Sequence, residues 1–337
     1  IVNTANKYKT NLSLIKSVIK SNDNRSKILL NRISKILKNK FKNRIISFLG
    51  VTFKANTDDM RDSSSLSMIP SLIKKGAKIN YFDPTGEKKD FKKLKNVSFS
   101  KDINSAIKNS DLIILGVPVG VMSSLVQEFA SSLKSGAIIT DVGSIKKGLI
   151  DSISPVLPKG VHFVPGHPIA GTENSGPESG FEELFKGRWC ILTPTKNTSK
   201  DAIKKVDYIW QQAGMKVTIM DAEYHDRVLA ITSHIPHLVA YSIVGTVTEL
   251  EDQLKTEVIK YSAGGFRDFT RIAASDPVMW RDVFLNNSGA VLEMLGRFIE
   301  DLTALQKSIR WKDGEALEEL FSKTRDIRKG IISEEQE

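Results

Sequence analysis

The sequence predicts an α/β fold, a doubly wound and mostly parallel sheet, followed by an all-helical region. From Arg44 onward, short apolar runs alternate with amphipathic stretches, which is the pattern of parallel strands joined by crossover helices. From Asp221 onward, strand-like runs give way to long stretches with helical periodicity. We therefore expect N-terminal helices over residues 1–43, a Rossmann-like domain over 44–220 and a helical domain over 221–337.

Each element follows from its own local pattern. Residues 10–42 carry apolar side chains at helical spacing between lysines, with a break at residues 21–23, and so predict two amphipathic helices. Short apolar runs predict seven strands: Ile45–Leu49, Lys78–Phe82, Leu112–Val117, Ala137–Asp141, Val161–Pro165, Arg188–Thr193 and Lys216–Met220. Helical periodicity between them predicts four helices: Leu66–Lys75, Met122–Leu133, Ile145–Val156 and Lys200–Ala213.

Composition limits the compartment and the class of protein. Cys190 is the only cysteine, so no internal disulfide can form, and we expect a cytoplasmic location. This cysteine lies inside the apolar run WCIL, and we assign it no nucleophilic role. The longest apolar stretch, Leu112–Met122, is shorter than the roughly 18–20 residues that span a bilayer, so no membrane segment or signal peptide is expected.

The positive charge is concentrated in one part of the chain. The formal charge is +10, but the first 100 residues alone carry 22 Lys and Arg against 7 Asp and Glu. An excess of this kind can indicate an anionic partner. The basic region contains no aromatic-basic RNA-binding pattern and no zinc-finger spacing, so we expect a solvated lysine face and no nucleic-acid partner.

Three predicted strands end in loops of small or polar residues: residues 116–120, 141–144 and 165–168. Ligands bind open parallel sheets beyond the carboxyl ends of the strands, so Ser144 and His167 are expected at one crevice. His167 is a candidate general base, or a histidine that holds a loop. Ser144 is a candidate N-cap of the next helix, and its hydroxyl could also orient a neighbouring imidazole.

The helical region adds further polar candidates. His234 and His237 lie three residues apart, with His225 upstream, but no HExxH motif or cysteine cluster accompanies them, so we expect no metal. We expect these histidines to be packing residues or substrate contacts. Arg267 and Arg271 follow two glycines, and arginine is suited to bidentate carboxylate binding, although surface ion pairs would explain both.

From about Asp111 onward, the sequence resembles the prephenate and arogenate dehydrogenases of tyrosine biosynthesis. The resemblance rests on TDVGSIK, VPGHPIAGTE, GRWCILTPT, HDRVLAITSHIPHLVAY and SAGGFRDFTRIAASDPVMWRD. It implies a catalytic His167 with Ser144 as its partner, and Arg271 as the ligand of the ring carboxylate. The same resemblance implies a substrate pocket lined by Thr172, Glu173, His234, His237, Arg267 and Trp280.

The implied reaction is an oxidative decarboxylation of a cyclohexadienol dianion, with NAD or NADP as cofactor. His167 would take the hydroxyl proton as hydride leaves, and loss of CO₂ would make the ring aromatic. The residues leave open whether the substrate is prephenate or arogenate, and which of the two cofactors is used. The helical region resembles the dimerisation domain of that family, so a homodimer is expected.

A second resemblance covers about residues 1–90. GVTFKANTDDMRDSS and KINYFDPTG are similar to the C-terminal, UDP-binding domain of UDP-glucose dehydrogenase, in which Lys54 and Arg61 would contact the ligand. The chain thus reads as a chimera joined between residues 90 and 111. The Rossmann-like domain would then have a UDP-glucose dehydrogenase-like part (44–90) and a prephenate dehydrogenase-like part (91–220).

The chimera weakens the expected cofactor site. A GxGxxG turn brings glycines and a helix N-terminus to a pyrophosphate, but here Thr52 and Ala55 replace the second and third glycines after Gly50. Other residues remain for the two ends of a dinucleotide: Asp83 for the ribose and Val117, Pro118 and Val119 for the nicotinamide side. We expect reduced dinucleotide affinity. The alternatives are a chimera that binds substrate without turnover and a UDP-sugar-binding remnant.

Overall fold

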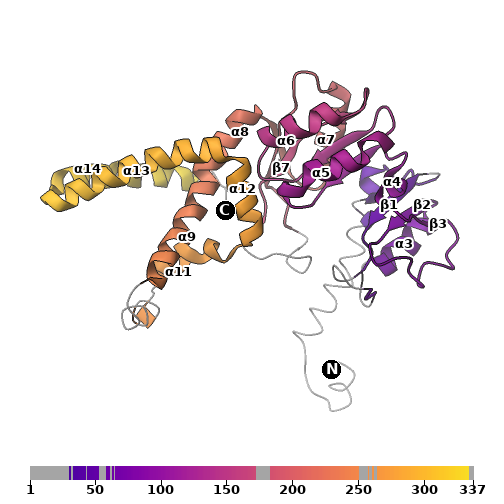
Figure 1. Ribbon diagram of the computed structural model, residues 1–337, viewed down its shortest axis with the longest axis horizontal. Coiled ribbons are helices and arrows are strands. Elements are labelled where there is room, and N and C mark those ends of the chain that lie inside the picture. The colour runs from indigo at the N-terminus through magenta and orange to yellow at the C-terminus, as the bar shows by residue number, and fades with distance from the viewer. Residues whose placement is uncertain are drawn as a thin grey trace, which may run out of the picture.

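The computed structural model describes residues 30–333, apart from residues 32, 43, 53–57, 61, 62, 64, 172–182, 250–256, 258, 259, 262 and 263. The first predicted helix lies outside the described residues, and residues 30, 31 and 33–36 give a helical end to the second. Figure 1 shows an α/β part, from which the helical part extends as a long arm formed by the last two helices.

The α/β part contains nine strands in three sheets of three strands each, counted over the described residues. The first sheet is parallel and has the order β1 (Ile45–Leu49), β2 (Lys78–Phe82), β3 (Val97–Phe99). The second is parallel, with the order β4 (Leu112–Leu115), β5 (Ile138–Asp141), β6 (His162–Phe163). In the third, β7 (Gly166–Pro168) is antiparallel to β8 (Trp189–Leu192), which is parallel to β9 (Lys216–Ile219).

The predicted α/β class is confirmed, and β1 and β2 have the predicted bounds. The prediction missed three short elements, β3, β7 and the five-residue helix α4 (Ile103–Ile107), which are too brief to show a period. Other crossover helices lie close to their predicted positions: α3 (Ser65–Lys74), α5 (Val119–Phe129), α6 (Lys147–Ile153) and α7 (Lys200–Gln212).

The strand pairing departs from one continuous doubly wound sheet. Such a sheet places its first strand beside the fourth, whereas here β1 and β4 belong to different sheets. Helix α4 lies against the first sheet, where the Ala106 carbonyl accepts hydrogen bonds from Ser47 Oγ at 2.7 Å and Asn80 Nδ2 at 3.0 Å. Apolar side chains of the separated strands stay exposed, with Leu49 at 48% and Ile114 at 47%.

The helical part shares its core with the second sheet. Trp280 and Val283 of α12 (Pro277–Asn286) are buried in the same apolar cluster as Ile139 of β5 and Met122 of α5. A Cβ on Gly120 would collide with the carboxylate of Asp282, so the glycine permits the close approach of α5 and α12. This packing fixes α12 against the carboxyl edge of β4 and β5.

Helices α8 (Ala222–Leu229) and α9 (Ile235–Thr248) are joined by a π-helical turn, η4 (Ala230–His234). Pro236 explains the turn, because proline lacks an N–H and its ring crowds the carbonyl four residues earlier. The remaining elements are α11 (Gly264–Thr270), the 3₁₀ turn η5 (Arg271–Ala274), α13 (Ser288–Trp311) and α14 (Gly314–Ser333).

The run from Ala222 to Val247 is long and apolar enough to cross a membrane, with a mean hydropathy of 1.4. Length and composition alone give weak support for a membrane span, since helices of soluble cores satisfy the same criteria. This run buries His225, Asp226 and His234, and Ile235 packs against Val291 and Met294 of α13. This run therefore carries polar groups into the interior of the protein.

Two isoleucines on neighbouring strands of the second sheet, one buried and one exposed, test whether the outer face of β4 is open to solvent. Ile139 of β5 is 0% exposed, whereas Ile114 of β4 is 47% exposed. We expect Ile139→Ala to lower the free energy of unfolding by about 2–5 kcal/mol, since it leaves a cavity, and Ile114→Ala by less than about 1 kcal/mol. Urea denaturation of both variants measures this, and equal losses would show that the outer face of β4 is covered.

Candidate active site

The candidate site is at the carboxyl edge of the second sheet. Val117 and Pro118 follow β4, Ser144 follows β5, and His167 is the central residue of β7, opposite Ile191 of β8. His167 is 8% exposed, so its ring is almost completely removed from water. The sequence placed these loops at one crevice, and the contacts below connect His167 to the helical part.

His167 is the end of a chain of three side chains. Its Nδ1 lies 2.9 Å from Nε2 of His225, and Nδ1 of His225 lies 2.8 Å from Oδ1 of Asp226. His225 is 0% exposed and Asp226 is 4% exposed. Both residues belong to α8, so a helix of the C-terminal part holds the ring of His167 from behind.

Asp226 also fixes the start of helix α6. Its Oδ1 accepts a hydrogen bond from the Lys146 backbone N–H at 2.8 Å, and its Oδ2 accepts one from Lys147 at 2.9 Å. The prediction that α6 begins at Ile145 with Ser144 as its cap is therefore wrong. The helix begins at Lys147, and a carboxylate 80 positions away in the sequence satisfies its first N–H groups.

Ser144 itself is half-buried in the loop before α6. Since Nδ1 of His167 is bonded to His225, a partnership of Ser144 with His167 would use Nε2 or a bound substrate. The role of Ser144 stays a prediction.

A buried ion pair lies directly beneath His167. Lys146 Nζ pairs with Asp141, both side chains are 0% exposed, and the same Nζ donates to the Gly166 carbonyl at 2.8 Å. Asp141 also accepts from the backbone N–H groups of Gly143 and Gly166. Burial lowers the pKa of Lys146, against the attraction of Asp141. The pair thus joins the loop after β5 to β7.

The environment keeps His167 neutral. Burial is the main cause that lowers its pKa well below the ordinary value, and His225, Lys146 and His234 add repulsion to a proton. A neutral imidazole is the form that can accept a proton, so the site holds His167 as a base.

A second group of rings lies on η4, α9 and α12. His237 stacks on Trp280 with ring centroids 3.7 Å apart, and His234 meets the same indole edge-on at 5.9 Å. His234 Nδ1 lies 3.2 Å from Nδ2 of Asn287, which also donates to the Asp226 carbonyl at 2.9 Å. A polar network therefore continues from His167 to this group. Burial lowers the pKa of His234 to about 4.

The predicted arginines lie at the outside of this group. Arg267 and Arg271 are exposed, and the charge of Arg271 is close enough to His237 to help lower the pKa of that imidazole, chiefly lowered by burial. Thr172, Glu173, Lys54 and Arg61 lie outside the described residues. The structure therefore gathers His234, His237 and Trp280 closely, with Arg271 nearby.

Sequence reasoning missed His225 and Asp226 as site residues. His225 was weighed with His234 and His237 as a metal ligand, a packing histidine or a substrate contact. Within the described ranges, no group of three or more His, Cys, Asp or Glu is placed to hold a metal. His225 and Asp226 lie in the motif HDRVLAITSHIPHLVAY, which carries the family resemblance. Their partners, His167 and Lys146, are 58 and 80 positions away in the sequence. No local pattern reveals such a contact.

The crevice has some of the features that a dinucleotide requires. Gly50 has φ +82°, and no atom lies within 4 Å of the position of a Cβ there, which fits the first glycine of a tight turn after β1. The loops after β4 and β5 leave small residues at the crevice, with Val117 half-buried and Val119 buried at the start of α5. These positions fit a nicotinamide dinucleotide.

Asp83 differs from an open ribose ligand. It is 2% exposed, and its carboxylate accepts from the Val51 N–H at 2.9 Å and from Thr85 Oγ1 at 2.6 Å, and pairs with Lys88 at 3.1 Å. Burial would raise the pKa of Asp83, but these donors lower it to about 2. Its contact with a ribose remains a prediction, because the ribose hydroxyl would have to donate to oxygens that already accept from these groups.

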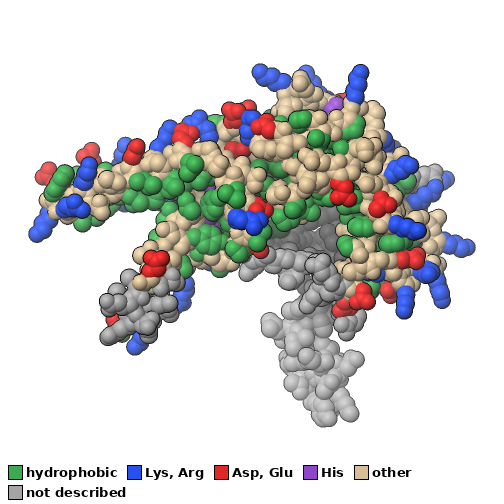
Figure 2. Space-filling model, in the orientation of Figure 1, with side chains coloured by type: hydrophobic (Ala, Val, Ile, Leu, Met, Phe, Trp, Pro, Cys, Tyr) green, Lys and Arg blue, Asp and Glu red, His purple; other side chains and the backbone are tan. Residues whose placement is uncertain are grey.

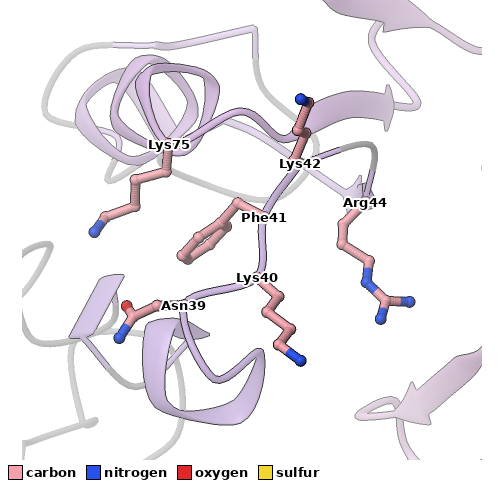
Figure 3. Close-up of a pocket in the computed structure, with 6 residues that line it drawn as sticks. All are labelled: Asn39, Lys40, Phe41, Lys42, Arg44 and Lys75. Atoms are coloured by element: carbon pink, nitrogen blue, oxygen red, sulfur yellow. The ribbon is translucent and has the colours of Figure 1, made fainter.

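The cavity in Figure 3 lies away from these residues. Its volume is about 550 Å³, and it is lined by Asn39, Lys40, Phe41, Lys42, Arg44 and Lys75. The lining combines four cations with one aromatic ring, and it contains none of the predicted site residues. It belongs to the basic N-terminal region that the charge distribution indicated.

Comparison with known proteins gives two matching domains in order. Residues 71–219 match the family model of the prephenate dehydrogenase nucleotide-binding domain, and residues 221–323 match that of its dimerization domain. The cyclohexadienyl dehydrogenase of Zymomonas mobilis is 43% identical over 227 residues, which cover 67% of this chain and 77% of that protein. The prephenate dehydrogenase of Bacillus subtilis is 36% identical over 228 residues, but the match spans only 61% of its length.

Part of the chain has a different relative. The UDP-glucose 6-dehydrogenase of Rickettsia bellii is 33% identical over 137 residues, which cover 40% of this chain and 31% of that protein. The second resemblance in the sequence is therefore supported as a partial similarity.

Among solved structures, the prephenate dehydrogenase from A. aeolicus in complex with hydroxyphenyl propionate and NAD⁺ superposes with a TM-score of 0.68. It is 32% identical, and the match covers 87% of this chain and 99% of that chain. Two family models together match most of the chain, and the Zymomonas mobilis relative is 43% identical over 77% of its own length. The chain belongs to the prephenate dehydrogenase family.

Proposed function

We propose that the chain oxidatively decarboxylates prephenate or arogenate with NAD⁺ or NADP⁺ as the oxidant, in tyrosine biosynthesis. The observation that carries this proposal is the buried, neutral His167, whose Nδ1 is bonded to His225. Nε2 is then the ring nitrogen that we propose to face the substrate. The family match and the dinucleotide-type fold support the same reaction class.

The proposed reaction requires one proton acceptor and one anion clamp. The hydroxyl-bearing ring carbon loses a hydride and its oxygen loses a proton, which gives a ring ketone. The ring carboxylate then leaves as CO₂, the electrons of the broken C–C bond complete the aromatic ring, and the resulting phenolate takes a proton back. The nicotinamide, when bound, accepts the hydride. His167 accepts the proton at Nε2, and the protein holds the substrate in line.

The second group of rings supplies the remaining contacts in this proposal. Buried Nε2 of His234 and Nε1 of Trp280 have no hydrogen-bond partner among the described residues. Buried polar groups are normally paired, so both positions suit a polar ligand. Arg271, beside His237, is placed to meet a carboxylate at the outer end, with Arg267, Thr172 and Glu173 as further proposed contacts.

The variant His167→Asn tests the proton acceptor. We expect kcat with prephenate or arogenate to fall about 10²–10⁴-fold, because a positioned base is removed while the fold keeps a polar side chain at β7. Absorbance of the reduced nicotinamide measures turnover, and calorimetry with the substrate measures binding.

The same pair of measurements separates the rival function, a protein that binds substrate without turnover. Turnover by the unmodified chain with either cofactor supports the dehydrogenase. Substrate binding without turnover by a folded chain favours the rival function. The motive for this rival is the incomplete GxGxxG motif, in which Thr52 and Ala55 replace glycines. Heat on addition of UDP-glucose would instead support the nucleotide-sugar remnant.

The variant Arg271→Gln tests the anion clamp. We expect KM to rise about 10–100-fold with a smaller change in kcat, since a charge-assisted hydrogen bond contributes about 1.5–3 kcal/mol. Arg297→Gln is the matched control, because Arg297 is exposed on α13 and pairs with Glu293 at 2.9 Å. An unchanged KM in Arg271→Gln would remove this arginine from the substrate site.

We also propose a homodimer formed through the helical part. Figure 2 shows hydrophobic side chains along the extended arm, where Leu292, Ile299, Ile309 and Trp311 of α13 are each more than half exposed. An apolar surface of this extent is typical of an interface between subunits. The match to a dimerization domain supports a second copy of this chain as the partner.

The double variant Leu292→Asp, Ile299→Asp tests the interface. We expect it to sediment as a monomer in analytical ultracentrifugation, because two carboxylates would be buried in an apolar contact. Glu300→Gln, on the charged side of the same helix, is the control and should leave the dimer intact. A double variant that remains dimeric would place the interface elsewhere.

A cytoplasmic location completes the proposal. Cys190 is buried as a free thiol, and burial raises its pKa to about 12, so it stays a protonated packing residue. A chain that depends on no disulfide suits a reducing compartment.

A further inference from the structure

We propose that His225 and Asp226 act as positioning residues, which hold His167 in the Nδ1–H tautomer and so leave its Nε2 lone pair for the substrate hydroxyl. The proposal deepens the proposed function and rests on it. It concerns residues for which sequence analysis gave no catalytic role.

The geometry is a linear relay of three buried side chains from two elements. His167 on β7 contacts His225 on α8 at 2.9 Å, and His225 contacts Asp226 at 2.8 Å. The rings of His167 and His225 meet edge-on, with centroids 5.2 Å apart. None of the three side chains is more than 8% exposed, so water does not compete for these bonds.

The carboxylate determines the direction of both hydrogen bonds. Asp226 accepts from the N–H groups of Lys146 and Lys147, and an ionised carboxylate only accepts. Nδ1 of His225 must therefore carry the proton that it donates to Asp226. A neutral His225 then has an unprotonated Nε2, which accepts from His167, so the proton of neutral His167 sits on Nδ1.

Several contacts prevent the relay from relaxing into another arrangement. The two backbone N–H groups fix the plane of the Asp226 carboxylate, and Asn287, between α12 and α13, donates to its backbone carbonyl at 2.9 Å. His225 and Asp226 are adjacent on α8, whose first turn is capped by Asp221. The ring of His167 is thus oriented by contacts that involve α8, the start of α6 and the residue between α12 and α13.

The charges around His167 come from each element packed against it. Lys146, before α6, and His234, on η4, oppose a proton on His167, while Asp141 neutralises part of the charge of Lys146. Asp226 lies behind His225 and favours a proton on His167 through the relay.

Asp226→Asn is the first test variant. It removes the charge, and the new amide can donate a hydrogen bond to Nδ1 of His225. Both hydrogen bonds of the relay would then run in the opposite direction. We expect kcat to fall about 10²–10⁴-fold, the range of a positioned general base, with KM changed little. The limb of the kcat profile that rises as His167 loses its proton should move to lower pH, because the anion that favoured the protonated form is gone.

Asp151→Asn is the matched control, since it makes the same chemical change on α6. Asp151 is 58% exposed and pairs with Lys147 on the surface, so kcat and the pH limb should not change. Unchanged kcat and an unmoved limb in folded Asp226→Asn would overturn the proposal.

A direct reading of the tautomer does not depend on turnover. The full chain contains five histidines, and selective ¹⁵N-histidine labelling allows the ring nitrogens of His167 to be assigned by comparison with His167→Asn. We expect the Nδ1–H form in the unmodified protein at neutral pH and a loss of that preference in His225→Gln. An Nε2–H form in the unmodified protein would overturn the relay even if the chain is an active dehydrogenase. The Nδ1–H form in an inactive chain would uphold the relay and reject the proposed function.

Discussion

The carboxylate of Asp226 joins the helical part of the molecule to the sheet. It accepts the first N–H groups of α6 and the Nδ1–H of His225, so the start of one helix and the orientation of the His167 ring depend on the same two oxygens. Each buried N–H that loses its acceptor would cost about 1–3 kcal/mol. The position of α8, and with it η4 and α9, is therefore set by polar contacts as well as by apolar packing.

The same network reconciles two demands on a buried base. His167 must be neutral before reaction, which burial and the nearby Lys146 ensure. It must also hold a proton during reaction, which an anion at the far side of His225 favours. Because Asp226 acts through an intervening ring, it stabilises the protonated form without forming a salt bridge that would protonate His167 in the resting state.

Local patterns predicted the parts of the fold and site that local forces determine. Strands β1 and β2 were found at their bounds, because short runs rich in β-branched and aromatic residues favour strands. The crevice at Ser144 and His167 followed from where the strands end. The start of α6 and the roles of His225 and Asp226 could not be predicted, because their partners lie 58–80 positions away and are brought together only by packing.

The polar network around His167 and the separate first sheet occupy different parts of the chain. Every member of the network lies between Asp141 and Asn287, whereas the similarity to UDP-glucose 6-dehydrogenase covers only 40% of the chain. Strands β1 and β4 do not pair with each other, and this break between the first two sheets separates the Gly50 turn and Asp83 from the loops beside His167. A defect in dinucleotide binding would therefore arise in the first sheet, while the groups that orient and neutralise His167 would remain in place.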